Sequence, residues 1–278
     1  MENKNFCVFI LTHGRPYNVI TYNTIKKCGY TGKVYFVIDN EDKRLESYQR
    51  KFGIDNVMIF DKKFYADNID EGNNFDERRG ILYARNACFD IAKKLDIKYF
   101  VQFDDDYTDF YYRFENKLGF TPKIKNLDKI FSIFLNFYIN TNILTIAFSQ
   151  GGDHIGGFSG MRLKRKAMNS FICSTDRPFN FIGVFNEDVN TYTTLGSRGD
   201  IFFTYTSIQL NQKPTQSQKG GITDLYKRFG TYCKSFTTVM MQPSSVKVYM
   251  MHTSNNRLHH SIKWINTVPM IIDDKYKK

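Results

Sequence analysis

Four short apolar runs, separated by helix-like segments, most constrain how this chain can fold. The runs lie at residues 6–11, 33–38, 56–60 and 98–103, and each is largely continuous rather than alternating. Continuous runs of this length are typical of strands in a parallel sheet that helices cover on both faces. The N-terminal half is therefore expected to form a Rossmann-like α/β sheet, in which ligands bind beyond the carboxyl ends of the strands.

The remaining segments extend this pattern to the rest of the chain. Helices are expected at 16–28 (with Pro16 in the first turn), 42–52, 75–95 and 127–140, and further strands at 144–149, 201–208 and 245–251. A glycine-rich loop lies at 151–160, and neither an internal repeat nor a clear linker is visible. The sequence therefore predicts a single domain over residues 1–278, whose second half covers a ligand site on the first.

Composition excludes several classes of protein. A chain that is 42% hydrophobic and 16% aromatic is not a disordered protein. No apolar stretch reaches about 18 residues, so no membrane helix is expected, and the N-terminal apolar run is too short for a signal peptide. The five cysteines are scattered without metal-site spacing, which is typical of reduced thiols in a cytoplasmic protein.

Positive charge is concentrated in the second half of the chain. Residues 1–150 carry 22 basic against 20 acidic residues, and residues 151–278 carry 17 against 8. Within 201–272 the count is eight basic residues against Asp224 alone. This asymmetry favours a polyanionic partner, with nucleic acid as the first candidate, although a charged surface that serves solubility is an equal alternative.

Three consecutive aspartates follow the strand expected at 98–103. Asp104, Asp105 and Asp106 end the segment FVQFDDDY, and adjacent carboxylates repel one another unless a positive partner accompanies them. Mg²⁺ is commonly held by one or two carboxylates together with substrate phosphates. A divalent cation site at this strand end is therefore predicted; the alternative is a solvated acidic loop.

The triplet and two further segments resemble motifs of the GT-A glycosyltransferases. FVQFDDDY is similar to the DxD-type motif that holds Mg²⁺ or Mn²⁺ on the diphosphate of a nucleotide-sugar. RGILYARNACFDIA (79–92) resembles the G-x-x-x-A-R-N segment of family 2-like members, and GVFNEDV (183–189) resembles their x-E-D element. The resemblance runs in order from about residue 6 to 252. It implies a GT-A fold with a mixed, mainly parallel sheet and an enzyme of the hexosyltransferase type.

The resemblance also assigns roles to residues. Asp188 is expected to be the catalytic base, with Glu187 in support, and this element favours inversion at the anomeric carbon. Metal ligands are expected at Asp104, Asp106 and, from a late strand end, His252. Each of these assignments has a structural alternative: a solvated acidic pair on a loop, or a structural histidine.

Donor-binding residues are expected at the ends of several strands. Asp104, Asp105 and Arg85 are placed at the diphosphate end, with Asp105 pointing toward the sugar or toward Arg85; the alternative for Arg85 is an exposed helix position. Thr12, Gly14 and Arg15, in THGRP, precede a helix whose N-terminus favours anions, and Asp39 stands where GT-A members place an acid that contacts the nucleoside. Helix capping is the alternative for both elements.

The DDD triplet, the THGRP start, the NEDV segment followed by SRGDIFF (197–203) and the run GGITDLYKRFGTYCKSF (220–236) most resemble one subgroup. It comprises the compact glycosyltransferases of phages and the base J glucosyltransferases, which modify hydroxymethylated pyrimidines in DNA. This implies UDP-glucose as donor, double-stranded DNA carrying hydroxymethylated pyrimidines as acceptor, no membrane, and the cytoplasm of an infected cell if a phage encodes the chain. The expected DNA-binding residues are Arg162, Lys164, Arg165, Lys227, Arg228, Lys234 and Arg257. Two alternatives stay open, namely a GT-A enzyme acting on a cell-surface glycan or protein, and an inert GT-A-like module that only grips DNA.

Overall fold

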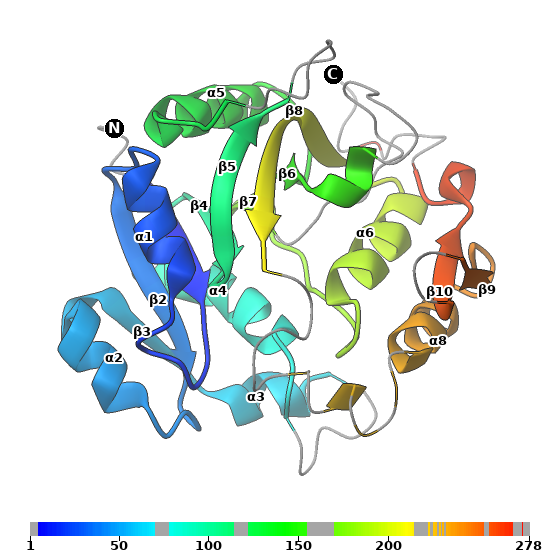
Figure 1. Cartoon of the computed structure of the whole chain (residues 1–278), viewed down its shortest axis with the longest axis horizontal. Helices are drawn as coiled ribbons and strands as arrows, with labels where there is room; N and C mark the ends of the chain where they lie inside the picture. Colours follow the sequence, from blue (N-terminus) through cyan, green and yellow to red (C-terminus); the bar gives the residue numbers. More distant parts are fainter. Residues whose placement is uncertain are drawn as a thin grey trace.

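One eight-stranded sheet gathers strands from both halves of the chain (Figure 1). The computed structural model describes residues 5–69, 78–113, 122–154, 170–213, 222, 225–226, 228, 230, 232–252, 256–268 and 274. The strands are β1 (Phe6–Leu11), β2 (Lys33–Asp39), β3 (Val57–Phe60), β4 (Tyr99–Asp104), β5 (Tyr107–Tyr112), β6 (Thr145–Ser149), β7 (Phe171–Ser174) and β8 (Phe202–Gln212). Their order across the sheet is β3-β2-β1-β4-β7-β6-β8-β5.

The sheet is mixed, with a parallel part formed by the N-terminal strands. β3, β2, β1 and β4 all pair in parallel, as do β6 and β8. β7 runs antiparallel between β4 and β6, and β5 lies antiparallel on the edge beside β8. Since β1, β2 and β4 run in the same direction, their carboxyl ends meet at one edge of the sheet.

Helices cover both faces of the sheet. They are α1 (Ile20–Lys27), α2 (Leu45–Phe52), α3 (Lys62–Asp67), α4 (Leu82–Lys94), α5 (Leu127–Ile139), α6 (Glu187–Ser197) and α8 (Tyr232–Met241), with 3₁₀ turns η1 (Ile54–Asn56), η2 (Gly151–His154) and η3 (Trp264–Asn266). Side chains of β1 alternate between two buried cores. Phe6, Val8 and Ile10 pack with α1, α2 and α5, while Cys7 and Phe9 pack with α3, α4 and α6.

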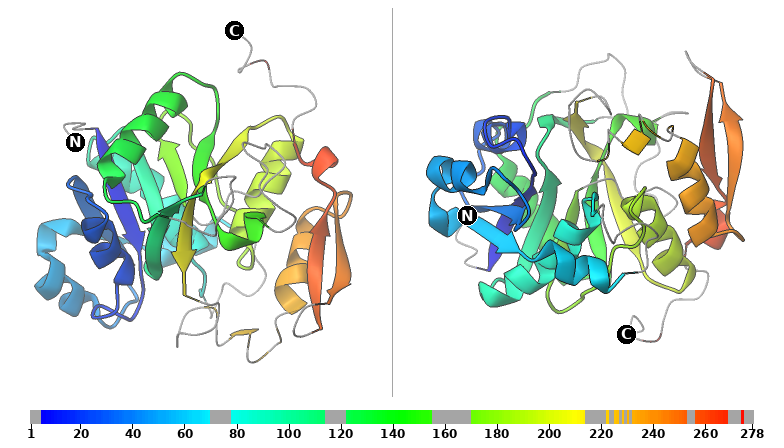
Figure 2. Two further views of the ribbon diagram at one scale, coloured as in Figure 1. Left: turned by 45° about the horizontal axis from the view of Figure 1, so that its top comes forward. Right: turned by 90° about the horizontal axis from the view of Figure 1, so that it is seen from below.

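A small unit stands beside this sheet at one edge of the molecule (Figure 2). It consists of α8 and an antiparallel hairpin of β9 (Val246–Met251) and β10 (Arg257–Ile262), whose strands pair with each other only. α8 packs against both hairpin strands and against α6. Within the described ranges, no helix is long and apolar enough to cross a membrane.

The fold confirms the α/β class and the strands that the apolar runs predicted. The helix expected at 16–28 begins only at Ile20, because the loop before it is pinned: the backbone N–H groups of Gly14 and Arg15 donate to Asp42 and Tyr48. Similarly, the helix expected at 75–95 is described only from Leu82 onward as α4, and residues 70–77 lie outside the described residues.

Candidate active site

The acidic triplet ends β4 and forms the turn toward β5. Asp104 is the last residue of β4, and Asp105 and Asp106 make the turn. Thr21 on α1 holds this turn, because its hydroxyl donates to the Asp104 carbonyl at 2.5 Å and its backbone N–H donates to the Asp105 carbonyl at 3.1 Å. The position of the three carboxyl groups is therefore set by backbone contacts from a neighbouring helix.

Arg85 on α4 joins the triplet to the acidic pair that begins α6. Its side chain is fully buried, and Nη2 donates to Asp104 Oδ1 at 2.9 Å while Nε donates to Glu187 Oε1 at 3.1 Å. The guanidinium carbon also lies 5.2 Å and 5.6 Å from the ring centroids of Phe171 and Phe181, within the range of cation–π attraction. Three segments that resemble one family's motifs thus form a single buried ion-pair chain.

Glu187 and Asp188 stand in the first turn of α6. Their exposed fractions are 8% and 9%, which excludes the alternative of a solvated acidic pair on a loop. Asp188 Oδ1 accepts the backbone N–H of Val189 at 2.8 Å, and a helix N-terminus stabilises negative charge. Before them, Asn186 adopts a left-handed conformation (φ 56°) and its side-chain amide donates to the Lys234 carbonyl of α8 at 3.0 Å.

The positive charges near the carboxyl groups of this site do not offset the effect of burial on their pKa values. Burial raises the pKa of Asp104 to about 7, with Asp106 adding to the rise and Arg85 opposing it. Burial, with the charge of Asp105, raises the pKa of Asp106 to about 6. Burial also raises the pKa of Glu187, against the opposing effect of Arg85. A cation added to this group would lower all three pKa values.

The loop after β1 contacts the middle aspartate. Thr12 donates from its hydroxyl to Asp105 Oδ2 at 2.6 Å, and Arg15 Nε lies 3.1 Å from the same oxygen. Asp105 therefore points toward this loop and not toward Arg85, which pairs with Asp104 instead, so that part of the expectation is corrected. The expectation that Asp105 faces the sugar stays a prediction. The Tyr48 hydroxyl braces the loop by bonding Thr12 and accepting the Arg15 backbone N–H.

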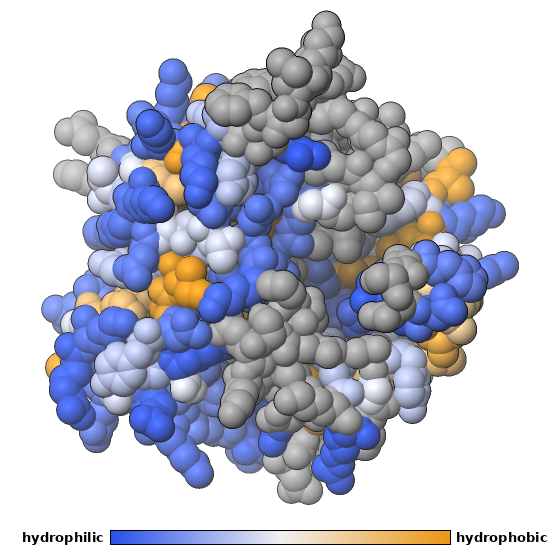
Figure 3. All heavy atoms as spheres, viewed as in Figure 1, coloured by the Kyte–Doolittle hydropathy of each residue, from blue (hydrophilic) through white to orange (hydrophobic). Residues whose placement is uncertain are grey.

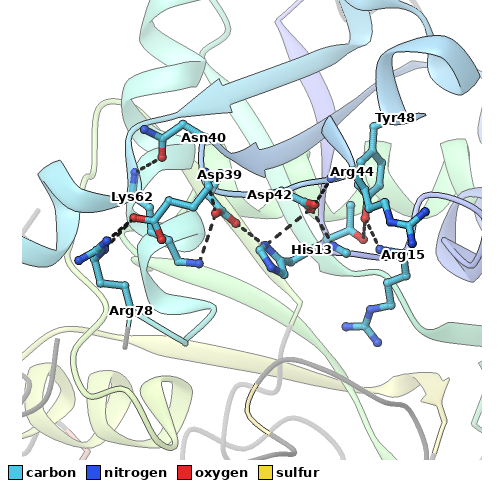
Figure 4. A network of polar contacts seen from close by, with 12 residues as sticks. His13, Arg15, Asp39, Asn40, Asp42, Arg44, Tyr48, Lys62 and Arg78 are labelled. Atoms are coloured by element: carbon cyan, nitrogen blue, oxygen red, sulfur yellow. Dashed lines mark hydrogen bonds and ion pairs between the residues drawn. The ribbon is translucent and has the colours of Figure 1, made fainter. Parts of the chain in front are cut away.

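Asp39 ends β2 at the centre of a polar network (Figure 4). Its Oδ2 accepts from His13 Nδ1 at 2.6 Å, and its Oδ1 lies 3.3 Å from Lys62 Nζ on α3. Asp42 Oδ2 accepts the Gly14 backbone N–H at 2.7 Å and lies 3.6 Å from His13 Nδ1. Although burial opposes it, His13 and Lys62 hold the pKa of Asp39 below its ordinary value. Both Asp39 oxygens thus have partners within the protein.

A divalent cation fits the chemistry of the triplet, but not all three expected ligands come together. Asp104 and Asp106, whose pKa values are raised chiefly by burial, supply the carboxylate oxygens that Mg²⁺ takes alongside phosphates. Among the described residues, no three His, Cys, Asp or Glu side chains are arranged to hold a metal. His252 is therefore not brought to Asp104 and Asp106; it follows β9, exposed, and its Nδ1 bonds Asn256 Oδ1 at 3.0 Å.

The expected DNA-binding residues fall into two groups. Arg162, Lys164, Arg165 and Lys227 lie outside the described residues. Arg228 is exposed just before α8, Lys234 lies on α8 with Nζ 5.7 Å from the Tyr226 ring centroid, and Arg257 is exposed at the start of β10. Tyr226 is buried and its ring stacks on that of Phe185, with the ring centroids 5.6 Å apart. It is therefore a packing residue and not an exposed ring on which a base could stack.

Sequence reasoning missed several residues of the site. His13, Asp42, Tyr48 and Lys62 complete the network around Asp39, and Asn186 ties α6 to α8. Polar residues directly after β1 and β2 were the available signal for His13 and Asp42, because strand ends gather at one sheet edge. Nothing in the local sequence marks the partners that helices α2 and α3 contribute.

A Rossmann-like sheet with an acidic turn at the end of β4, joined by a buried arginine to an acidic helix start, defines a GT-A glycosyltransferase. Residues 6–221 match the family described as TET-Associated Glycosyltransferase, and the chain belongs to this family. Among curated proteins, no sequence matches the chain.

Solved structures of other glycosyltransferases are similar in outline. UDP-bound TarS of S. aureus is 12% identical, with a TM-score of 0.43, over 85% of this chain and 65% of its own. Glucosyl-3-phosphoglycerate synthase of Mycobacterium tuberculosis, with Mg²⁺ and UDP, is 9% identical, with a TM-score of 0.46, over 94% of this chain and 88% of its own. The mannosyltransferase PcManGT of Pyrobaculum calidifontis, with GDP-Man and Mn²⁺, is 10% identical, with a TM-score of 0.47, over 86% of this chain and 72% of its own. The chain spans less than two thirds of the length of TarS.

Proposed function

We propose that the chain transfers a hexose, with UDP-glucose as donor, to a hydroxymethylated pyrimidine in double-stranded DNA, with Mg²⁺ or Mn²⁺ as cofactor. The observation that carries the proposal is the buried chain Asp104–Arg85–Glu187, which brings a donor-type carboxylate cluster and an acceptor-type carboxylate pair into one site. Asp104 and Asp106 would hold the cation. When bound, the cation neutralises the diphosphate as it leaves.

The chain's own residues supply the proton transfer and the positioning. We assign Asp188 as the base that takes the proton of the acceptor hydroxyl while that oxygen bonds to the anomeric carbon. The bond from the anomeric carbon to the diphosphate breaks, and the nucleoside diphosphate leaves with the electron pair. Glu187, held by Arg85, orients the base; attack from the face opposite the diphosphate inverts the anomeric configuration.

A polyanionic acceptor is supported by the charge of the C-terminal unit. From residue 225 to residue 272 the sequence contains six lysines and arginines and not one carboxylate. The exposed side chains of this unit include the aromatic residues Tyr232, Phe236 and Tyr249 and the basic residues Lys247 and Arg257. Figure 3 shows hydrophilic and hydrophobic side chains next to each other along this edge. Basic residues that meet phosphates beside aromatic rings that stack on bases are typical of nucleic-acid binding.

The unit is also tied directly to the catalytic helix. The Asn186 amide, one residue before Glu187, donates to the Lys234 carbonyl and to Thr238 Oγ1 at 2.9 Å. An acceptor bound on α8 would therefore be held at a fixed position relative to the base. This connection favours transfer to DNA over an inert module that only grips DNA.

The test incubates the protein with Mn²⁺, a panel of nucleotide-sugars, and duplex DNA with or without hydroxymethylated pyrimidines. Nucleoside mass spectrometry should detect a hexose on the hydroxymethylated bases, with UDP-glucose giving the highest yield. Donor hydrolysis without transfer to DNA would indicate a glycan or protein acceptor. Salt-dependent DNA binding without any donor turnover would indicate the inert module.

A further inference from the structure

His13 presents one ring nitrogen to a ligand and keeps the other for the protein. Its side chain is 47% exposed, whereas the side chains of its partners Asp39 and Asp42 are 6% and 1% exposed. The contacts of the imidazole with described residues are made by Nδ1, which bonds Asp39 at 2.6 Å. Figure 4 shows the ring projecting from the loop after β1, below both aspartates. Nε2 is thus the atom available to a bound molecule.

Asp39 also fixes which ring nitrogen carries the proton. The carboxylate is ionised because its pKa is lowered, so it accepts hydrogen bonds and donates none. Nδ1 must therefore hold a hydrogen in both protonation states of His13. In the neutral ring Nε2 is a hydrogen-bond acceptor, and in the charged ring it is a donor.

We propose that His13 Nε2 accepts a hydrogen bond from the ring N–H of the donor's nucleobase, and so selects uracil over cytosine. Asp39 would be the residue that positions His13 rather than a direct contact of the nucleoside, since both of its oxygens are engaged by His13 and Lys62. The inference rests on the proposed nucleotide-sugar donor and names the group that reads its base.

The surroundings favour an N–H group over a phosphate at this position. Two carboxylates, Asp39 and Asp42, lie within 3.6 Å of His13 Nδ1, and Lys62 Nζ lies 3.3 Å from Asp39. An anion beside this pair is repelled unless the ring is charged. In the sheet, β2 lies on the opposite side of β1 from β4. A donor whose diphosphate sits at Asp104 and whose nucleoside lies over the ends of β1 and β2 would place its base at His13.

Uracil and cytosine differ at the atom that matters. The uracil ring N3 carries a hydrogen and donates, whereas the cytosine N3 accepts and would meet another acceptor at Nε2. An unmatched polar pair in a partly buried site weakens binding roughly 5- to 150-fold. The hydrogen bond to Asp39 raises the pKa of His13, with Asp42 adding to the rise and burial and Lys62 opposing it. Part of the His13 population is therefore charged near neutral pH, and binding of an N–H donor must release that proton.

Calorimetric titration with UDP and with CDP, in Mn²⁺ and in two buffers of different ionisation enthalpy, tests the inference. Wild type should prefer UDP roughly 5- to 150-fold at pH 9 and less at pH 5.5. Wild type should release more protons on UDP binding than His13→Ala does. Protons released by the phosphates and by Asp104 are common to both proteins and cancel in this difference. His13→Ala should bind both nucleotides equally, while His13→Gln, whose amide oxygen can accept, should keep part of the preference.

Tyr17→Ala is the matched control, because Tyr17 is an exposed ring of the same loop that lies 5.5 Å from Lys51 Nζ and outside the network. It should keep the wild-type preference and proton release. An unchanged UDP preference in His13→Ala, or proton uptake relative to that variant, would overturn the inference and leave the proposed function standing. Failure of the wild type to bind either nucleotide would instead refute the proposed function.

Discussion

Replacement of Arg85 by methionine should destabilise the protein strongly. Methionine fills similar space beside Phe171 and Phe181 but leaves Asp104 and Glu187 buried without their shared cation. Removing one partner of a buried ion pair costs about 3–5 kcal/mol of unfolding free energy. For a chain of this size each kcal/mol lowers Tm by about 2–4 °C, so the melting temperature should fall by roughly 6–20 °C.

Urea unfolding followed by circular dichroism measures this loss, with Arg50→Met as the matched control. Arg50 pairs with Glu46 at 3.7 Å on the exposed surface of α2, where such a pair contributes at most about 0.5 kcal/mol. Adding Glu187→Gln to Arg85→Met should recover part of the stability, because it removes one uncompensated charge. The reasoning is refuted if Arg85→Met and Arg50→Met lose the same unfolding free energy, or if the second substitution destabilises further.

Three other predictions concern the carboxylates. The pKa of Asp104 is about 7 in the folded protein against an ordinary value of 3.8, so between these pH values the folded state binds a proton that the unfolded state has lost. This contribution to the free energy of unfolding disappears as pH rises through about 7. Between pH 5 and pH 8, urea unfolding should therefore show a larger loss of unfolding free energy for wild type than for Asp104→Asn. Asp188→Asn should keep donor affinity in calorimetry and lower transfer by roughly two to four orders of magnitude, and surviving transfer would move the base to Glu187. Asp106→Ala should abolish the Mn²⁺-dependent part of donor affinity, and unchanged affinity would contradict its assignment as a ligand.

The parallel part of the fold could be predicted because its strands carry their own signal. β1, β2 and β4 are largely buried on both faces, so burial makes them continuous apolar runs. β5 and β7 gave no such signal. β5 (YTDFYY) lies at the edge of the sheet directly after the acidic turn, and β7 has only four residues, so neither rises above its flanking sequence.

Helix α6 carries the x-E-D motif that the sequence revealed, but its helical structure could not be predicted. Its sequence, EDVNTYTTLGS, is rich in β-branched residues that form helices poorly, and its N-cap Asn186 makes no capping bond. Burial stabilises it instead, and the hydroxyls of Thr191 and Thr193 donate back to the carbonyls of residues 187 and 189. Tertiary packing of this kind leaves no local pattern, and the same holds for Tyr48 and Lys62, which α2 and α3 bring to the network around His13.

The charges of the site give a physical reason for a metal-dependent donor. Among the described residues, the five carboxylates of Asp104 to Asp106, Glu187 and Asp188 face the guanidinium groups of Arg15 and Arg85, and Lys213 adds a positive charge near Asp106. Such a site repels a diphosphate, and the raised pKa values of Asp104 and Asp106 show that it already draws protons to reduce its own charge. Protons cancel that repulsion without attracting phosphate. A divalent cation would do both, and because Arg85 also holds Glu187, charge brought to Asp104 would act on the same ion-pair chain that we propose orients the base.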